Sequence, residues 1–134
     1  RQAQKLAVDV EGDLLMAVAE VYAKSGDTNE EQFYTYHIPR FFNSQRSGLL
    51  SQYAVYAKRF PTSNYWATAT KYAQEDGSRI VRLNAILNLY LLAKEWKDED
   101  KEQEVMDIIS NEKDERIIKN LKLNKIIKDD TTDE

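Results

Sequence analysis

The sequence predicts an all-α protein, and three observations support this. Apolar residues recur at helical spacing along most of the 134 residues, only four glycines and two prolines are available for turns, and no segment alternates cleanly between apolar and polar residues. A chain of this length fits one domain that can bury a core without disulfides or metal. The scarcity of turn residues also indicates long helices.

The first predicted helix spans residues 2–24. Its apolar stripe recurs every three or four positions and consists of Leu6, Val10, Leu14, Val18 and Val21. Acidic residues lie away from this stripe, among them Asp9, Asp13 and Glu20. The run at 25–27, Ser-Gly-Asp, is typical of a helix end.

Residues 32–42 are rich in aromatic side chains, and we expect a connector there because Pro39 favours an extended or turn-like residue before it. A second helix is predicted to begin with Ser47 as its cap and to stop at Pro61. Its core residues are expected to be Leu49, Leu50, Tyr53, Tyr56 and Phe60. A third helix is predicted to start at Thr62 or Ser63 and to end at residues 76–77.

The fourth predicted helix, residues 78–96, is the most apolar segment of the chain. Only Asn84 and Asn88 interrupt its apolar faces, so it is apolar on most of its circumference. We therefore expect burial on several sides, either in the centre of a bundle or partly against another subunit. We predict partial burial by another subunit, which coverage of Leu89 and Ala93 within their own fold would contradict. Two further helical segments follow, before an acidic tail with the composition of a disordered segment.

Charge is distributed unevenly along the chain. Residues 1–36 carry three cations and seven acids, residues 37–96 carry eight cations and three acids, and residues 97–134 carry eight cations and thirteen acids. Within the basic middle, residues 32–74 contain no acid at all. A basic middle between acidic ends points to a polyanionic partner.

Several classes of function are excluded or disfavoured by composition. The chain has no cysteine and one histidine, His37, so neither a thiolate nor a histidine-based metal site is expected, and no cofactor is predicted. No apolar run is long enough to span a bilayer, and no signal peptide is visible. Glycine-rich phosphate loops, HExxH and GxSxG are absent. We therefore predict that the protein is not an enzyme.

The paired carboxylates and the histidine have simple structural interpretations. Asp9 and Asp13 lie one turn apart on a helix with its own apolar stripe, which indicates a solvated face. Glu30 and Glu31 are expected to be charges of a loop or a helix start. His37 lies beside Pro39 and several aromatics, and we expect it to be packed or surface-exposed rather than catalytic.

The acid-free window holds eleven of the fourteen aromatic residues, which are interpreted mainly as core rather than as base-stacking platforms. Core packing does not explain why cations remain there. We predict contacts to nucleic-acid phosphates, without sequence preference, from Arg40, Arg46, Lys58, Arg59, Lys71, Arg79 and Arg82. Arg79 and Arg82 begin a helix, where the macrodipole disfavours cations; the alternatives are solvent exposure or a salt bridge to Glu75 or Asp76.

The middle of the chain resembles the coat proteins of filamentous and rod-shaped archaeal viruses (the rudivirus, lipothrixvirus and tristromavirus group). The resemblance covers about residues 38–110. It rests on Pro-Arg-Phe at 39–41, a polar turn, Leu-Ser-Gln-Tyr at 50–53, Tyr65 in a helix of small residues, and the long apolar helix after it.

The resemblance implies a helical bundle with an extended N-terminal helical arm. It divides the chain into the arm (1–36), a helical core (37–110), and an amphipathic helix with an acidic tail (111–134). It also implies a structural virion protein that forms a homo- or hetero-dimer with an identical or homologous subunit and a helical homo-oligomer. Such dimers wrap double-stranded, A-form DNA in a helical nucleocapsid, so the implied location is the virion, or otherwise the cytoplasm. In the arm, only Arg1 and Lys5 are available as DNA contacts.

Two alternatives stay open. Gly48-Leu49, Ala54-Val55, Lys58 and the later run at 82–96 resemble the small helical subunit of type III CRISPR effector complexes, a non-catalytic protein that lines a nucleic-acid filament. The third possibility is a helical interaction module whose basic belt docks an acidic protein. Salt dependence separates this third possibility from nucleic-acid binding, because release from DNA follows a steep slope set by the number of phosphate contacts.

Overall fold

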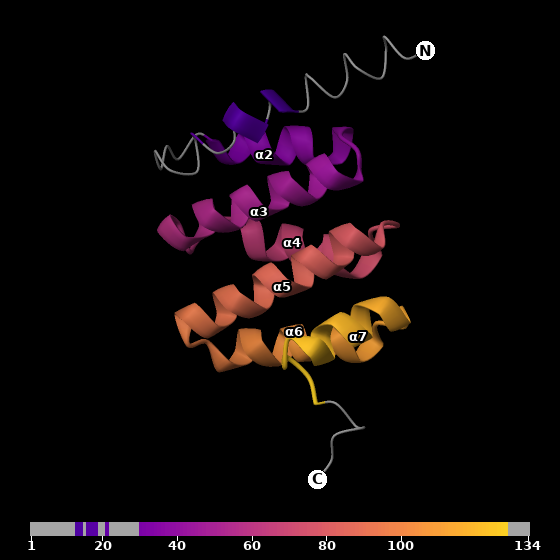
Figure 1. The fold of residues 1–134 in the computed structure, drawn as a ribbon. Coiled ribbons are helices and arrows are strands. Elements are labelled where there is room, and N and C mark those ends of the chain that lie inside the picture. Colours follow the sequence, from indigo (N-terminus) through magenta and orange to yellow (C-terminus); the bar gives the residue numbers. More distant parts are fainter. Residues whose placement is uncertain (1–12, 15, 19–20, 22–29, 129–134) are drawn as a thin grey trace, which may run out of the picture.

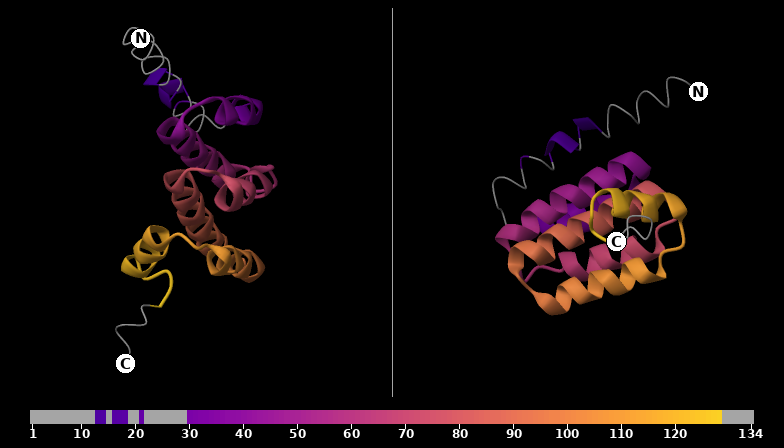
Figure 2. Two further views of the ribbon diagram at one scale, coloured as in Figure 1. Left: turned by 90° about the vertical axis from the view of Figure 1, so that its right-hand side faces the viewer. Right: turned by 60° about the horizontal axis from the view of Figure 1, so that its bottom comes forward.

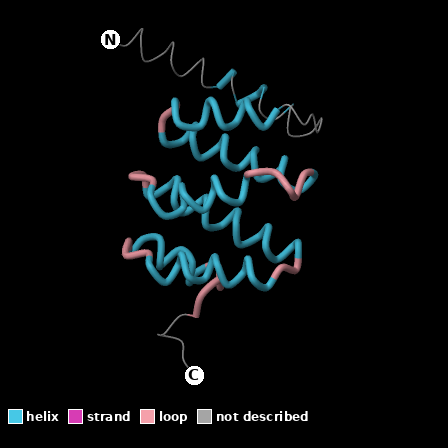
Figure 3. Tube along the Cα trace, turned by 180° about the vertical axis from the view of Figure 1, so that it is seen from behind, coloured by secondary structure: helices cyan, strands magenta, loops and turns pink. Residues whose placement is uncertain are grey.

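The structure, a computed structural model, describes residues 13–14, 16–18, 21 and 30–128. The elements are α2 (Glu30–His37), the 3-10 helix η1 (Ile38–Arg40), α3 (Asn43–Arg59), α4 (Tyr65–Glu75), α5 (Arg79–Trp96), α6 (Glu99–Asn111) and α7 (Glu115–Leu123). Short loops join these helices, and the described part of the chain contains no strand (Figure 3). The all-α prediction is confirmed.

Successive helices alternate between two sides of the molecule. α2, α4 and α6 lie on one side and α3, α5 and α7 on the other (Figure 2, left). Figure 1 shows the same order as a stack that begins with α2 and ends with α6 and α7. α3, α4 and α6 all pack against α5, which is therefore the central helix of the domain.

The burial of α5 corrects one expectation from the sequence. Leu89 and Ala93 are both 0% exposed within their own chain, so the prediction that another subunit covers them is wrong. The predicted bounds of α5 are confirmed: the Ser78 hydroxyl accepts a hydrogen bond from the Val81 amide at 3.4 Å. Lys97 has a left-handed φ of 54° and ends the helix after Trp96.

The expected connector at residues 32–42 is also wrong, because most of this segment is helical. α2 ends at His37 and η1 follows directly. Pro39 lies in the first turn of η1, where its missing amide hydrogen costs nothing and its fixed φ suits a helix start. The sequence argument placed the proline correctly outside a helix interior, but helices occupy both sides of it.

The starts of α3 and α4 differ from the predicted caps. α3 begins at Asn43, so Ser47 is a buried residue inside it rather than a cap, and the Asn84 amide donates a hydrogen bond to its hydroxyl. Asn88 donates to Ser51 at 3.0 Å. The two asparagines that interrupt α5 therefore face α3. α4 begins at Tyr65, two residues after Ser63.

One hydrophobic core crosses the boundaries expected from the sequence. Tyr34 of α2 and Ile117 and Leu121 of α7 are fully buried in the same cluster as the helices between them. An aspartate caps the start of each of the last two helices. In α6, Asp98 accepts a hydrogen bond from the Lys101 amide at 3.0 Å, and in α7, Asp114 accepts one from the Arg116 amide at 2.8 Å.

The described residues of the N-terminal segment are helical. Met16 packs on α3 above Gly48, where an added Cβ would come within 2.6 Å of the Met16 methyl carbon. Leu14 and Val21 are 65% and 66% exposed, so these two residues of the predicted apolar stripe point away from the core. The remainder of the predicted helix at 2–24, its expected end at 25–27 and the tail at 129–134 lie outside the described residues.

Candidate nucleic-acid interface

Most of the aromatic residues of the acid-free window form part of the core. Tyr34 stacks on Tyr53 with ring centroids 5.1 Å apart, and Tyr65 packs edge-on against Tyr53 at the same distance. Burial is the main reason why the pKa values of all three tyrosines are raised. The interpretation of this cluster as core rather than as a base-stacking surface is confirmed.

Acids at the N-terminal edge of the window serve this cluster. Tyr34 donates a hydrogen bond to Glu30 at 2.9 Å, and Tyr53 donates to Glu31. Glu31 also accepts from the Asn64 backbone amide at 2.7 Å. Both glutamates lie at the start of α2, as expected, but they also hold the aromatic cluster in place.

Arg46 is bound on the other side of the window by Asp76. Its Nε and Nη2 atoms lie 2.8 and 2.9 Å from the two carboxylate oxygens, a bidentate pair in which the Asp76 side chain is 6% exposed. Burial would raise the pKa of Asp76, but the hydrogen bonds from Arg46 and the Ser78 amide, with the charges of Arg46 and Arg82, hold it below its usual value. Arg46 is therefore a structural residue.

Arg79 and Arg82 are paired with the loop between α6 and α7. The Arg79 Nε lies 2.8 Å from Asp114, and the Arg82 Nε lies 3.1 Å from Glu112. Arg82 also donates to the Asp76 carbonyl at 2.8 Å. The arginines do form salt bridges, but with partners more distant in sequence than the predicted Glu75 and Asp76.

The other predicted contacts are scattered. The Arg40 guanidinium lies 3.8 Å from the ring centroid of Tyr36, and Lys58 forms an exposed ion pair with Glu95 at 3.3 Å. Arg59 is exposed near the end of α3. Arg1 and Lys5 lie outside the described residues. The five cations of the window, with Arg79 and Arg82 after it, are therefore spread over η1, α3, α4 and α5.

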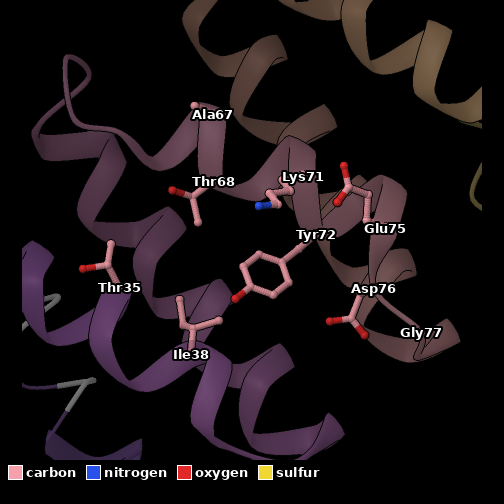
Figure 4. A pocket seen from close by; sticks show the side chains of 9 residues that line it. All are labelled: Thr35, Ile38, Ala67, Thr68, Lys71, Tyr72, Glu75, Asp76 and Gly77. Atoms are coloured by element: carbon pink, nitrogen blue, oxygen red, sulfur yellow. The ribbon is translucent and has the colours of Figure 1, made fainter.

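Lys71 lines a cleft of about 640 Å³ between α4 and the segment of α2 and η1 (Figure 4). Thr35 and Ile38 contribute one wall, and Tyr72 points from α4 toward Ile38. Glu75 and Asp76 line the same cleft, so Lys71 shares it with two acids. This mixed charge does not favour a phosphate ligand.

A second basic surface lies on α7 and the residues after it, and we call it the α7 basic face. Residues 116–128 contain no acid, and its five cations are Arg116, Lys119, Lys122, Lys125 and Lys128. Four of them are exposed and Lys122 is half-buried. Among the described residues, no carboxylate lies at ion-pair distance from any of the five.

The packing of α7 places these cations outward. Ile117 and Leu121 are fully buried on one side of the helix, and the helical period directs Lys119 and Arg116 to the opposite side. Lys119 and Lys122 also line a hollow of about 350 Å³ together with Ile118, the exposed Leu123 and one acid, Glu115.

Sequence analysis missed the α7 basic face. Net charge was counted over residues 97–134, where thirteen acids conceal the acid-free run at 116–128. The run at 116–128 is shorter than the window at 32–74 but equally free of acids, and this is the signal in the sequence that marks the face.

The acids and the histidine of the described residues were predicted to have structural roles. They include no group of three or more positioned to hold a metal ion. His37 packs among aromatic rings, with centroids 4.7 Å from Phe33 and 4.9 Å from Tyr36. Of the described helices, none has the length and hydrophobicity needed to cross a membrane.

Comparisons with protein-family models, with curated proteins and with solved structures find no match to this chain.

Proposed function

We propose that this protein is a non-catalytic structural subunit that binds along a nucleic acid through its phosphate backbone, without sequence preference. The observation that supports the proposal is the α7 basic face, with five cations, no acid in residues 116–128 and no intramolecular ion pair among the described residues. Lysine and arginine side chains of this kind neutralise phosphates and release counterions.

The arrangement of α7 suits a backbone contact rather than base recognition. Arg116, Lys119 and Lys122 follow one another at three-residue spacing on a rigid helix whose opposite side is locked into the core. The shifted pKa values belong to buried tyrosines and to members of ion pairs, which is consistent with a structural role.

Two forms of this function follow from the resemblances of the sequence. In the first, the protein is a virion coat subunit that pairs with an identical or homologous copy and wraps duplex DNA. In the second, it is the small helical subunit of a type III CRISPR effector complex. The complete burial of Leu89 and Ala93 within one chain favours the second form, because the core does not need a partner to close it.

The decisive experiment measures binding of fluorescently labelled nucleic acid by the full chain over a series of salt concentrations. Replacing Lys119 and Lys122 with glutamine should reduce the slope of log K against log salt by roughly two units on duplex DNA. The matched control replaces Lys58 and Lys94, whose side chains are half-exposed in ion pairs elsewhere, and should leave the slope nearly unchanged.

If the two double variants reduced the salt slope equally, α7 would have no special role in binding. Absence of binding by the parent protein at low salt would refute the proposal. Comparing duplex DNA, duplex RNA and single strands, with electron microscopy of each mixture, tests the form: the coat protein requires filaments that appear only when duplex DNA is added.

A further inference from the structure

Among the described residues, exposed apolar side chains form a stripe on the N-terminal helix and another on α5. The first is on the N-terminal helix, where Leu14, Val18 and Val21 are 65%, 37% and 66% exposed. Their spacing of four and then three residues places them on one face. Met16 lies on the opposite face and packs against α3, which keeps the exposed stripe pointing away from its own core.

The second surface runs along the outer side of α5. Ile80 and Leu91 are 50% and 62% exposed, and the half-buried Leu87 lies between them on the same face. At the start of this stripe, a hollow of about 680 Å³ is lined by Phe42, Ile80, Arg79, Arg82 and Asp114 together with polar residues from the starts of α3 and α5. Phe42 is also largely exposed, so the hollow combines apolar walls with two arginines and the aspartate that pairs with Arg79.

Charge distinguishes the two surfaces. Residues 6–23, which contain the N-terminal stripe, include four acids and no cation, and Asp13 is exposed beside Leu14. α3 and α5 together contain six cations and one acid. Arg79 and Lys94, at the two ends of the α5 stripe, are half-exposed, and their ion pairs are with side chains from other elements. Such partly exposed pairs contribute little and can exchange partners.

From this complementarity we propose that the N-terminal helix of one copy docks on the α5 stripe of a second copy, head to tail. Leu14, Val18 and Val21 pack against Ile80, Leu87 and Leu91, while the exposed Asp13 beside Leu14 faces a cation at the end of the stripe. Pairing of two N-terminal helices would instead bring like acids together. A heterologous contact of this kind can build rings or open filaments.

This contact rests on the proposed function, in which copies of the chain assemble along a nucleic acid, and it names the surfaces through which they would meet. Its test needs no nucleic acid. The mass of the full chain is measured over a concentration series by sedimentation or light scattering. Leu91→Asp alters one surface, and the double variant Leu14→Asp/Val21→Asp alters the other. Tyr36→Asp is the matched control, because Tyr36 is 55% exposed on α2 and belongs neither to the two surfaces nor to the α7 basic face.

We expect the parent and the control to associate alike and each of the two surface variants to dissociate at least tenfold more readily. Mixing the two surface variants should restore a complex that contains one copy of each, because one intact helix and one intact stripe remain. Since all substituted side chains are exposed, circular dichroism should show unchanged helix content in every variant.

Three results would overturn the proposal. In the first, the parent protein stays monomeric at the highest concentration. In the second, Leu91→Asp associates as the parent does while the N-terminal double variant does not, which indicates pairing of N-terminal helices alone. In the third, the two surface variants do not form a mixed complex. Nucleic-acid binding is measured separately on the same variants. Normal binding by a non-associating variant shows that this contact, and not the proposed phosphate interface, was removed.

Discussion

The two basic regions of this protein have similar compositions and different environments. In the acid-free window and just after it, Arg46, Arg79 and Arg82 are held by carboxylates from other parts of the chain. On the α7 basic face, Lys119 and its neighbours have no such partner within the described structure. A count of charges along the sequence therefore does not identify a surface that is available to a polyanion. Pairing in three dimensions decides this.

The largest expected effect is on the Arg46–Asp76 pair. Asp76→Asn leaves the Arg46 guanidinium, whose side chain is 17% exposed, without its carboxylate. We expect the free energy of unfolding to fall by about 3 kcal/mol, measured by urea denaturation. The neighbouring Glu75→Gln, at an exposed position, serves as control and should change it by less than about 0.5 kcal/mol. A loss below about 1 kcal/mol for Asp76→Asn would show that the pair is solvated.

The same carboxylate predicts a specific pH dependence. Because the pKa of Asp76 is lower in the folded state, its contribution to stability is fully present above the unfolded value of about 3.9 and is lost as the pH falls through the folded value. Acid titrations of unfolding should therefore be shallower for Asp76→Asn than for the parent below about pH 4. Parallel curves for the two proteins would contradict the assigned role.

Substitution of Arg82 should lower the free energy of unfolding more than substitution of Arg79, and neither should affect nucleic-acid binding as substitutions on the α7 basic face are expected to do. Arg82→Gln breaks a mostly buried pair with Glu112 and should lower the free energy of unfolding by about 2 kcal/mol. Arg79→Gln removes a half-exposed side chain and should lower it by less than about 1 kcal/mol. The sequence alone predicts that losing both arginines flattens the salt slope of DNA binding. From the structure we expect an unchanged slope. A flattened slope would mean that the start of α5 contacts the nucleic acid.

A smaller effect is expected where α3 meets α5. Ser51→Ala removes the hydrogen bond that Asn88 donates at 3.0 Å and should lower the free energy of unfolding by about 1 kcal/mol, with nucleic-acid binding unaffected. Ser44→Ala, at an exposed position of the same helix, is the control and should be nearly neutral. Equal values for the two variants would mean that the asparagine finds another partner.

Local rules predicted part of the fold correctly. Ser78 caps α5, Tyr53 and Tyr56 are core residues, and the all-α class follows from helical spacing. The rules failed where the signal depended on packing. Pro39 was taken to mark a long connector, but it begins a 3-10 turn between two helices, and Ser47 was taken as a cap, but it is a buried partner of Asn84.

The sequence by itself determined the class of this protein: helical periodicity, few turn residues and an uneven distribution of charge are local properties that any compact arrangement must accommodate. Only the tertiary structure decided which charges are available. Asp76, Glu112 and Asp114 meet the arginines because α3, α5 and the loop after α6 come together in space, at separations of 30 or more residues for Arg46–Asp76, Arg82–Glu112 and Arg79–Asp114. Whether a cation is neutralised depends on Coulomb interactions over a few ångströms, and a linear sequence does not contain those distances.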